Sequence, residues 1–187
     1  MMFSKSRPNK IVLTGFRATG KSTIGLLIAK QLGYRFLDTD QVLTEQLGAS
    51  IAQVVASHGW AYFRRAEAQL LDDLSSESQM VIATGGGAIE HLVEWQRLRY
   101  ESLVVWLEAD AETINRRIAA DAASTAQRPA LLSGAAPKDE IVQLLNQRSP
   151  LYEHGSDLRL DTVNFSLQDL VTRVCDTFVR RKKQCNG

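Results

Sequence analysis

Residues 15–23 of this chain read GFRATGKST and fit the pattern G-x-x-x-x-G-K-[ST]. The apolar run Lys10–Thr14 before them predicts a buried strand, and apolar residues at helical spacing predict a helix after them. A strand, a glycine loop and a helix in this order form a phosphate site, because loop N–H groups and the helix N-terminus converge on one point. We predict that Lys21 meets the β- and γ-phosphates of a nucleotide and that the Ser22 hydroxyl binds Mg²⁺. A structural turn that carries Lys and Ser by coincidence is the alternative, which both flanks disfavour.

The composition is that of an ordinary globular domain. Of 187 residues, 44% are hydrophobic and 23% are charged, which suits one domain with a full hydrophobic core. The net charge of +1 excludes a strong overall attraction to nucleic acid or acidic membranes. No apolar run approaches the length of a transmembrane helix, and Met1–Lys10 lacks the apolar stretch of a secretory signal. We therefore expect a cytoplasmic protein with no nucleic-acid partner and no membrane partner.

The two cysteines and the basic C-terminus indicate no separate function. Cys175 falls on the apolar side of the predicted last helix, and Cys185 lies in the tail, so neither a disulfide framework nor a metal site is expected. The run RRKK at 180–183 fits a nucleic-acid patch or the cations of a last helical turn. We favour the second interpretation.

Strand and helix signals alternate along the chain. Predicted strands follow at 35–38, 80–84, 102–107 and 157–161, and predicted helices at about 41–47, 50–56, 60–74, 110–117 and 137–147, with a last helix headed by the capping-box pair Ser166 and Asp169. Residues 119–136, rich in Ala, Ser and Gly, predict a mobile loop. The alternation predicts an α/β fold, a parallel sheet with helices on both faces that binds ligands beyond the carboxyl ends of its strands.

Two aspartates and three glycines follow predicted strands at that edge. Asp38 and Asp40 point the same way if their backbone is extended, so that one could serve the water shell of Mg²⁺ and the other an acceptor hydroxyl. The alternative is a pair of turn residues, one of which caps the helix near Gln41. The glycines 85–87 offer bare backbone N–H groups to a ligand, where a simple turn would need fewer glycines.

Three arginines are candidates for binding anions. Arg64 and Glu67, three residues apart on a predicted helix, form either an ordinary surface ion pair or a grip on a substrate carboxylate that Glu67 orients. Arg128 lies in the predicted mobile loop, where a cation could close over phosphate, and Arg148 precedes Ser149–Pro150. For each arginine a solvated surface position is the alternative.

Six motifs in order make the chain resemble the shikimate kinase family from about Lys10 to the last helix. They are GFRATGKST, LDTD at 37–40, FRRAE at 63–67, TGGGA at 84–88, RP at 128–129 and RSPLY at 148–152. The resemblance implies a three-layer sandwich around a five-stranded parallel sheet of the nucleoside-monophosphate-kinase type. It implies one domain over 1–187, with a substrate-binding insertion at about 39–75 and a mobile lid at about 119–136.

The resemblance also implies a monomer that binds ATP and shikimate, requires Mg²⁺, and phosphorylates the shikimate 3-hydroxyl in aromatic amino acid (chorismate) biosynthesis. Asp40 would hold that hydroxyl and take its proton, and Asp38 would support the metal through water. Arg64, Arg148 and the amides of Gly85, Gly86 and Gly87 would bind shikimate, with Glu67 orienting Arg64. Lys21 and Arg128 would act on the transferred phosphate, and Arg117 would lie along the adenine. The implied ATP-binding set is Gly15, Ala18, Thr19, Gly20, Lys21, Ser22, Thr23, Arg117 and Arg128.

The chain departs from the family pattern in several places. Ala18 stands where a middle glycine is usual, and Arg17 replaces a residue that is typically uncharged; Arg17 either touches phosphate or points to solvent. Val55 stands where the substrate pocket often has an aromatic residue, and Trp60 either compensates for it or packs. Two other functions stay open: a kinase for another small hydroxy acid or a nucleotide, and a nucleotide-binding module without catalysis.

Overall fold

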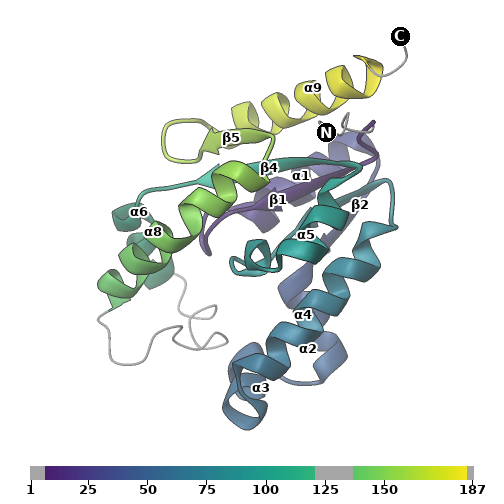
Figure 1. The fold of residues 1–187 in the computed structure, drawn as a ribbon. Helices are drawn as coiled ribbons and strands as arrows, with labels where there is room; N and C mark the ends of the chain where they lie inside the picture. The colour runs from purple at the N-terminus through teal and green to yellow at the C-terminus, as the bar shows by residue number, and fades with distance from the viewer. Residues whose placement is uncertain (1–6, 121–136, 185–187) are drawn as a thin grey trace.

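The computed structural model describes residues 7–120 and 137–184, without the side chain of Pro137. Figure 1 shows a central sheet with helices on both sides. In chain order the elements are β1 (Lys10–Thr14), α1 (Lys21–Leu32), β2 (Arg35–Asp38), α2 (Thr39–Leu47), α3 (Ile51–His58), α4 (Trp60–Ser75), β3 (Met80–Ala83), the 3₁₀ turn η1 (Ala88–Glu90), α5 (Leu92–Arg99), β4 (Ser102–Glu108), α6 (Ala111–Ala120), α8 (Pro137–Gly155), β5 (Leu158–Asp161) and α9 (Leu167–Gln184).

The five strands form one parallel sheet in the order β2-β3-β1-β4-β5. β1 lies in the middle and is fully buried, which explains why its sequence is a continuous apolar run. Because all the strands are parallel, their carboxyl ends meet at one edge. The loop 15–23, the start of α2 and the glycines 85–87 all follow strands at that edge. The predicted fold class is confirmed.

Alternate strand residues face two separate cores. Ile11 and Leu13 of β1 pack with residues of α1 and α9 on one face, whereas Val12 packs with residues of α4, α5 and α8 on the other. Figure 1 shows these two helical layers on opposite sides of the sheet. A smaller cluster joins Phe16 to residues of α6 and α8. The phosphate-loop candidate is therefore packed against α6 and α8 as well as against the sheet.

Several predicted boundaries needed correction. The sequence did not predict α5, and the predicted helix 137–147 continues to Gly155, with Pro150 inside it. The continuation is stabilised by Tyr152, which is buried, stacks 5.7 Å from the ring of Trp106 and donates a hydrogen bond to the Gly86 carbonyl. Tertiary packing here outweighs the usual break at proline. Ala119 and Ala120, assigned to the lid, belong to α6; the rest of the predicted lid lies outside the described residues.

The two predicted helix caps at Asp110 and Ser166 are confirmed. Asp110 accepts a hydrogen bond from the Thr113 amide at the head of α6, and Ser166 accepts one from the Asp169 amide at the head of α9. Cys175 is buried on the apolar side of α9 as predicted. Cys185 lies outside the described residues. In the part of the chain that the structure describes, no helix is both long and apolar enough to span a bilayer.

Candidate active site

The loop 15–23 forms a turn around the head of Lys21. Lys21 is the first residue of α1, and its ammonium donates hydrogen bonds to the carbonyls of Gly15 at 2.9 Å and Phe16 at 2.7 Å. Gly15 has φ 134°, and a Cβ there would collide with the carbonyl oxygen of Leu107, so only glycine allows β4 to approach this closely. The loop thus gathers a cation and a helix N-terminus at the carboxyl edge of the sheet, as an anion site requires.

Ala18 stands where the family usually has glycine, and the structure shows what this costs. Its φ is +62°, in the left-handed region that disfavours a Cβ by about 1–2 kcal/mol. The loop keeps its shape around it, because the Thr19 hydroxyl donates a hydrogen bond to the Phe16 carbonyl at 2.8 Å and Arg117 Nη1 donates one to the Ala18 carbonyl at 3.2 Å. The departure from glycine therefore leaves the loop intact at the expense of local strain.

Asp38 connects the loop to the second strand. Its Oδ2 accepts a hydrogen bond from the Ser22 hydroxyl at 2.5 Å, and its Oδ1 accepts one from the Asp40 amide at 3.0 Å. Asp38 is also the N-cap of α2. One residue therefore caps the helix, as the structural alternative expected, and contacts Ser22, as the functional interpretation expected.

The predicted geometry of the aspartate pair was wrong, because Asp40 is not extended. α2 begins at Thr39, which places Asp40 in the first helical turn. Its side chain nevertheless reaches the pocket: a Cβ on Gly85 would lie 2.7 Å from Asp40 Oδ1. Gly85 is thus a glycine because the carboxylate occupies the space of a side chain. Asp40 is well placed to act as a base toward a hydroxyl in this pocket.

A network of charges forms the other side of the pocket. Arg64 Nη1 donates to Glu67 Oε2 at 2.5 Å, and the guanidinium lies 5.4 Å from the centre of the Trp60 ring. His91 Nε2 contacts the same Glu67 oxygen at 2.8 Å. Arg64 is therefore held by a buried carboxylate and by an aromatic face, so it is not an ordinary surface cation. Trp60 lines the pocket, whereas Val55 packs against the core of α4 and α5.

Glu67 has an unusual electrostatic environment. Its side chain is 2% exposed, and burial alone would raise its pKa. The hydrogen bond with His91 and the charge of Arg64 outweigh that effect and hold the pKa of Glu67 below its ordinary value of 4.5. The carboxylate is thus kept ionised beside Arg64.

This lowered pKa predicts how stability responds to acid. As pH falls, Glu67 is protonated in the unfolded chain before it is protonated in the folded protein. The stability that the ionised Glu67 gives to the folded protein is therefore complete above about pH 4.5 and is lost as pH falls through the lowered folded pKa. Between about pH 5 and about pH 3, the free energy of unfolding should therefore fall more steeply for the wild type than for Glu67→Gln. Urea unfolding at several pH values measures both slopes. Parallel slopes would contradict the lowered pKa.

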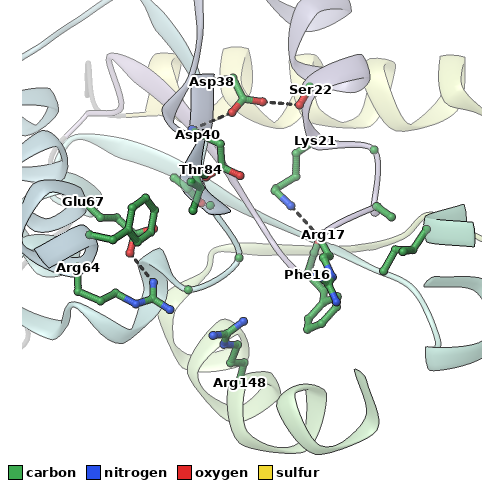
Figure 2. Close-up of a pocket in the computed structure, with 18 of the residues that line it drawn as sticks. Phe16, Arg17, Lys21, Ser22, Asp38, Asp40, Arg64, Glu67, Thr84 and Arg148 are labelled. Carbon is green, nitrogen blue, oxygen red and sulfur yellow. Dashed lines mark hydrogen bonds and ion pairs between the residues drawn. The ribbon is translucent and has the colours of Figure 1, made fainter. Parts of the chain in front are cut away.

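Arg148 and Glu90 complete the network. Arg148 lies on α8 and is 4% exposed, and its Nε donates to Glu90 Oε1 at 2.7 Å. The other Glu90 oxygen lies 3.5 Å from Arg64 Nη2. Figure 2 shows Arg64 and Arg148 reaching toward the same part of the pocket from different helices. Two arginines that are far apart in the sequence thus both contact the carboxylate of Glu90.

The three glycines lie against three different groups, which a simple turn would not require. A Cβ on Gly87 would collide with the guanidinium of Arg64, and the Gly86 carbonyl accepts the hydrogen bond of Tyr152. The amide of Gly85 donates to the Thr39 hydroxyl at 2.9 Å, so the expectation that it is bare was wrong. All three glycines line the pocket.

The remaining arginines have different positions. Arg17 lines the pocket and pairs with Glu140 of α8 at 3.3 Å, so it is not simply a solvated side chain. Arg117 donates to the Thr162 hydroxyl and carbonyl as well as to the Ala18 carbonyl, so it joins the loop 15–23 to the residue that follows β5. Arg128 lies outside the described residues.

Many of these groups line one cavity of about 330 Å³, the size of a small-molecule site. Figure 2 shows Lys21, Ser22, Asp38 and Asp40 along one side, with the Arg64–Glu67 pair and Arg148 on the other. The described residues that line it include the predicted Gly20, Lys21, Ser22, Thr23, Asp38, Asp40, Arg64, Glu67, Gly85, Gly86, Gly87 and Arg148. Four residues that contact the lining had no predicted role: Thr39, Glu90, His91 and Tyr152. Glu90 and His91 follow the triple glycine closely enough to be suspected.

A family model described as shikimate kinase matches residues 17–179 of the chain. The chain belongs to the shikimate kinase family. A shikimate kinase from Geobacter sulfurreducens is 41% identical over 91% of this chain and 90% of its own length, and one from Synechococcus is 39% identical over 88% and 81%. The solved shikimate kinase from Acinetobacter baumannii in complex with shikimate superposes with a TM-score of 0.83 at 28% identity, covering 94% of this chain and 95% of that one. As a member of this family, the protein is a kinase with a P-loop.

Proposed function

We propose that this kinase transfers the γ-phosphoryl group of ATP to the 3-hydroxyl of shikimate, which gives shikimate 3-phosphate and ADP. The observation that supports the proposal most is the cavity itself. A phosphate loop, a carboxylate at the start of α2 and two arginines line one space, so a donor and an acidic acceptor can meet there. Phosphoryl transfer depends chiefly on such positioning and on charge stabilisation.

The two arginines favour an acceptor that carries a carboxylate. A planar guanidinium binds a carboxylate through two parallel hydrogen bonds, and two guanidiniums facing one space favour a single anionic group between them. Arg64 and Arg148 have this arrangement beside the glycines, and the related Acinetobacter enzyme has been solved with shikimate bound. We assign the shikimate carboxylate to Arg64 and Arg148, and the ring to the surface formed by the glycines.

In the proposed reaction, the oxygen of the 3-hydroxyl attacks the γ-phosphorus and its proton passes to the Asp40 carboxylate. The bond from the γ-phosphorus to the bridging oxygen breaks, and that oxygen leaves with ADP. Lys21 and the N-terminus of α1 stabilise the charge on the phosphate oxygens. To do so, the Lys21 ammonium exchanges its contacts with loop carbonyls for contacts with phosphate.

The groups at Ser22 and Asp38 fit Mg²⁺. Mg²⁺ prefers oxygen ligands and keeps several waters, so one hydroxyl and one carboxylate suffice when phosphates supply the rest. The Ser22 hydroxyl and Asp38 Oδ2 lie 2.5 Å apart beside the loop. We assign Ser22 as a direct ligand and Asp38 as a ligand through water. Bound there, Mg²⁺ would neutralise charge on the β- and γ-phosphates.

Four further expectations stay predictions. Arg117 is assigned to the adenine and Arg128 to the γ-phosphate, as the family pattern implies. A cytoplasmic monomer is likewise expected.

One assay tests the proposed function. Purified protein with Mg²⁺ and ATP should release ADP in proportion to the shikimate that is added. ADP release with another hydroxy acid but not with shikimate would indicate a different acceptor. ATP binding without turnover on any acceptor would indicate a binding module.

A further inference from the structure

Glu90 is a charged residue that the proposed reaction does not use. It ends η1, three residues after the last of the three glycines, and its side chain is 38% exposed. Its two oxygens contact different helices: Oε1 accepts from Arg148 on α8 at 2.7 Å, and Oε2 lies 3.5 Å from Arg64 on α4. One carboxylate therefore links the two arginines that face the cavity.

The contact with Arg148 leaves the binding end of that side chain available. A guanidinium has one donor at Nε and four at its two terminal nitrogens. Glu90 takes the Nε donor, so the two terminal nitrogens can still receive a carboxylate end-on. Arg64 and Arg148 are among the described residues that line the cavity and Glu90 is not, so its carboxylate does not fill the space between the arginines and the glycines.

The charges of the cluster also balance. Arg64 and Arg148 carry two positive charges, and Glu67 and Glu90 carry two negative charges. Without Glu90, the two guanidiniums would face the cavity with Glu67 as the only carboxylate of this cluster to balance their charges. Arg148 would then lose its only hydrogen bond that the structure describes. No described hydrogen bond would then fix the plane of its guanidinium before the acceptor binds.

We propose that Glu90 is a positioning residue for acceptor binding. It fixes the plane of the Arg148 guanidinium through Nε, so that Arg148 presents its two terminal nitrogens to the carboxylate of the acceptor. It also keeps Arg64 beside Arg148, where the N–H groups that Arg64 does not give to Glu67 and Glu90 can bind the same carboxylate. The inference rests on the proposed function, because it takes shikimate as that acceptor. The benefit is preorganisation: a fixed guanidinium loses less side-chain freedom when the carboxylate binds.

The test compares Glu90→Ala and Glu90→Gln with the wild type. Glu90→Ala should raise the KM for shikimate by about fivefold, the effect of about 1 kcal/mol, while kcat and the KM for ATP change less than twofold. Glu90→Gln should lie closer to the wild type, because its amide oxygen can still accept from Arg148 Nε. Glu153→Ala, an exposed carboxylate on the same helix as Arg148, is the matched control and should have no effect.

Titration calorimetry with shikimate and with its methyl ester distinguishes an effect on carboxylate binding from a general loss of the substrate site. The loss of affinity in Glu90→Ala should appear with shikimate and vanish with the ester, which has no carboxylate. A wild type that binds shikimate and a Glu90→Ala variant that binds it equally well, or more tightly, would overturn this inference alone. Equal losses for acid and ester would also overturn it. A wild type that binds no shikimate would overturn the proposed function and this inference together.

Discussion

An Asp40→Asn variant should lose turnover by a factor of about 10²–10⁴, while its affinity for ATP stays nearly unchanged. The amide has the shape of the carboxylate but cannot take up the proton of the acceptor hydroxyl. ATP binding should survive, because in the proposed site the phosphates are held by Lys21 and the N-terminus of α1, and an asparagine keeps the shape of the Asp40 side chain beside them. Steady-state kinetics with ADP detection gives kcat, and calorimetry with a non-hydrolysable ATP analogue gives the affinity.

Glu45→Gln is the matched control for Asp40→Asn. Glu45 is an exposed carboxylate near the other end of the same helix, where it accepts a hydrogen bond from Gln41. This change should leave kcat within twofold of the wild type. If Asp40→Asn also retained full turnover, Asp40 could not be the base, and the proton would have to leave by another route.

Arg64→Ala should chiefly weaken shikimate binding and raise its KM by roughly 10²-fold, or about 2.7 kcal/mol. The variant loses the guanidinium that faces the cavity, and it also leaves Glu67 buried with His91 as its remaining described partner. An uncompensated buried carboxylate is costly, so the free energy of unfolding should fall as well. Initial rates at varied shikimate and saturating ATP measure the first effect, and urea unfolding measures the second.

The neighbouring arginine separates a specific effect from a loss of surface charge. Arg65 is exposed on the same helix, and its guanidinium lies over the ring of Tyr62 at 5.9 Å. Arg65→Ala should leave the KM for shikimate within twofold of the wild type. A defect of Arg64→Ala confined to the affinity for ATP would refute the assignment of Arg64 to the acceptor.

The centre of the sheet could be predicted from sequence because β1, β3 and β4 are buried on both faces. β1 has the predicted bounds Lys10–Thr14, and β4 is the same kind of unbroken apolar run. Helix α5 could not be predicted in this way. Its Leu92 and Val93 are 63% and 59% exposed, whereas Trp95 and Leu98 are buried, so the apolar residues of the segment do not mark one face. The periodicity that reveals a helix is absent there.

The candidate site was predictable where a short motif carries its own geometry. Lys21 and Ser22 begin the helix after the loop, as the strand–loop–helix pattern indicated. Ser22 donates a hydrogen bond to Asp38, which the second predicted strand placed at the same edge of the sheet. The position of Asp40 followed from a wrong premise, since the helix starts at Thr39 and the backbone is not extended. Glu90 could not be paired with Arg148 from sequence, because 58 residues separate them and only the packing of η1 against α8 brings them together.

The proposed reaction requires that a phosphate and an acceptor hydroxyl meet between the loop 15–23 and Asp40. A crystal structure with Mg²⁺, a non-hydrolysable ATP analogue and shikimate tests this directly. We expect the terminal phosphate beside Lys21, the 3-hydroxyl against the Asp40 carboxylate, and the shikimate carboxylate on Arg64 and Arg148. Shikimate bound outside this cavity, or with its 3-hydroxyl turned away from both Asp40 and the terminal phosphate, would contradict it.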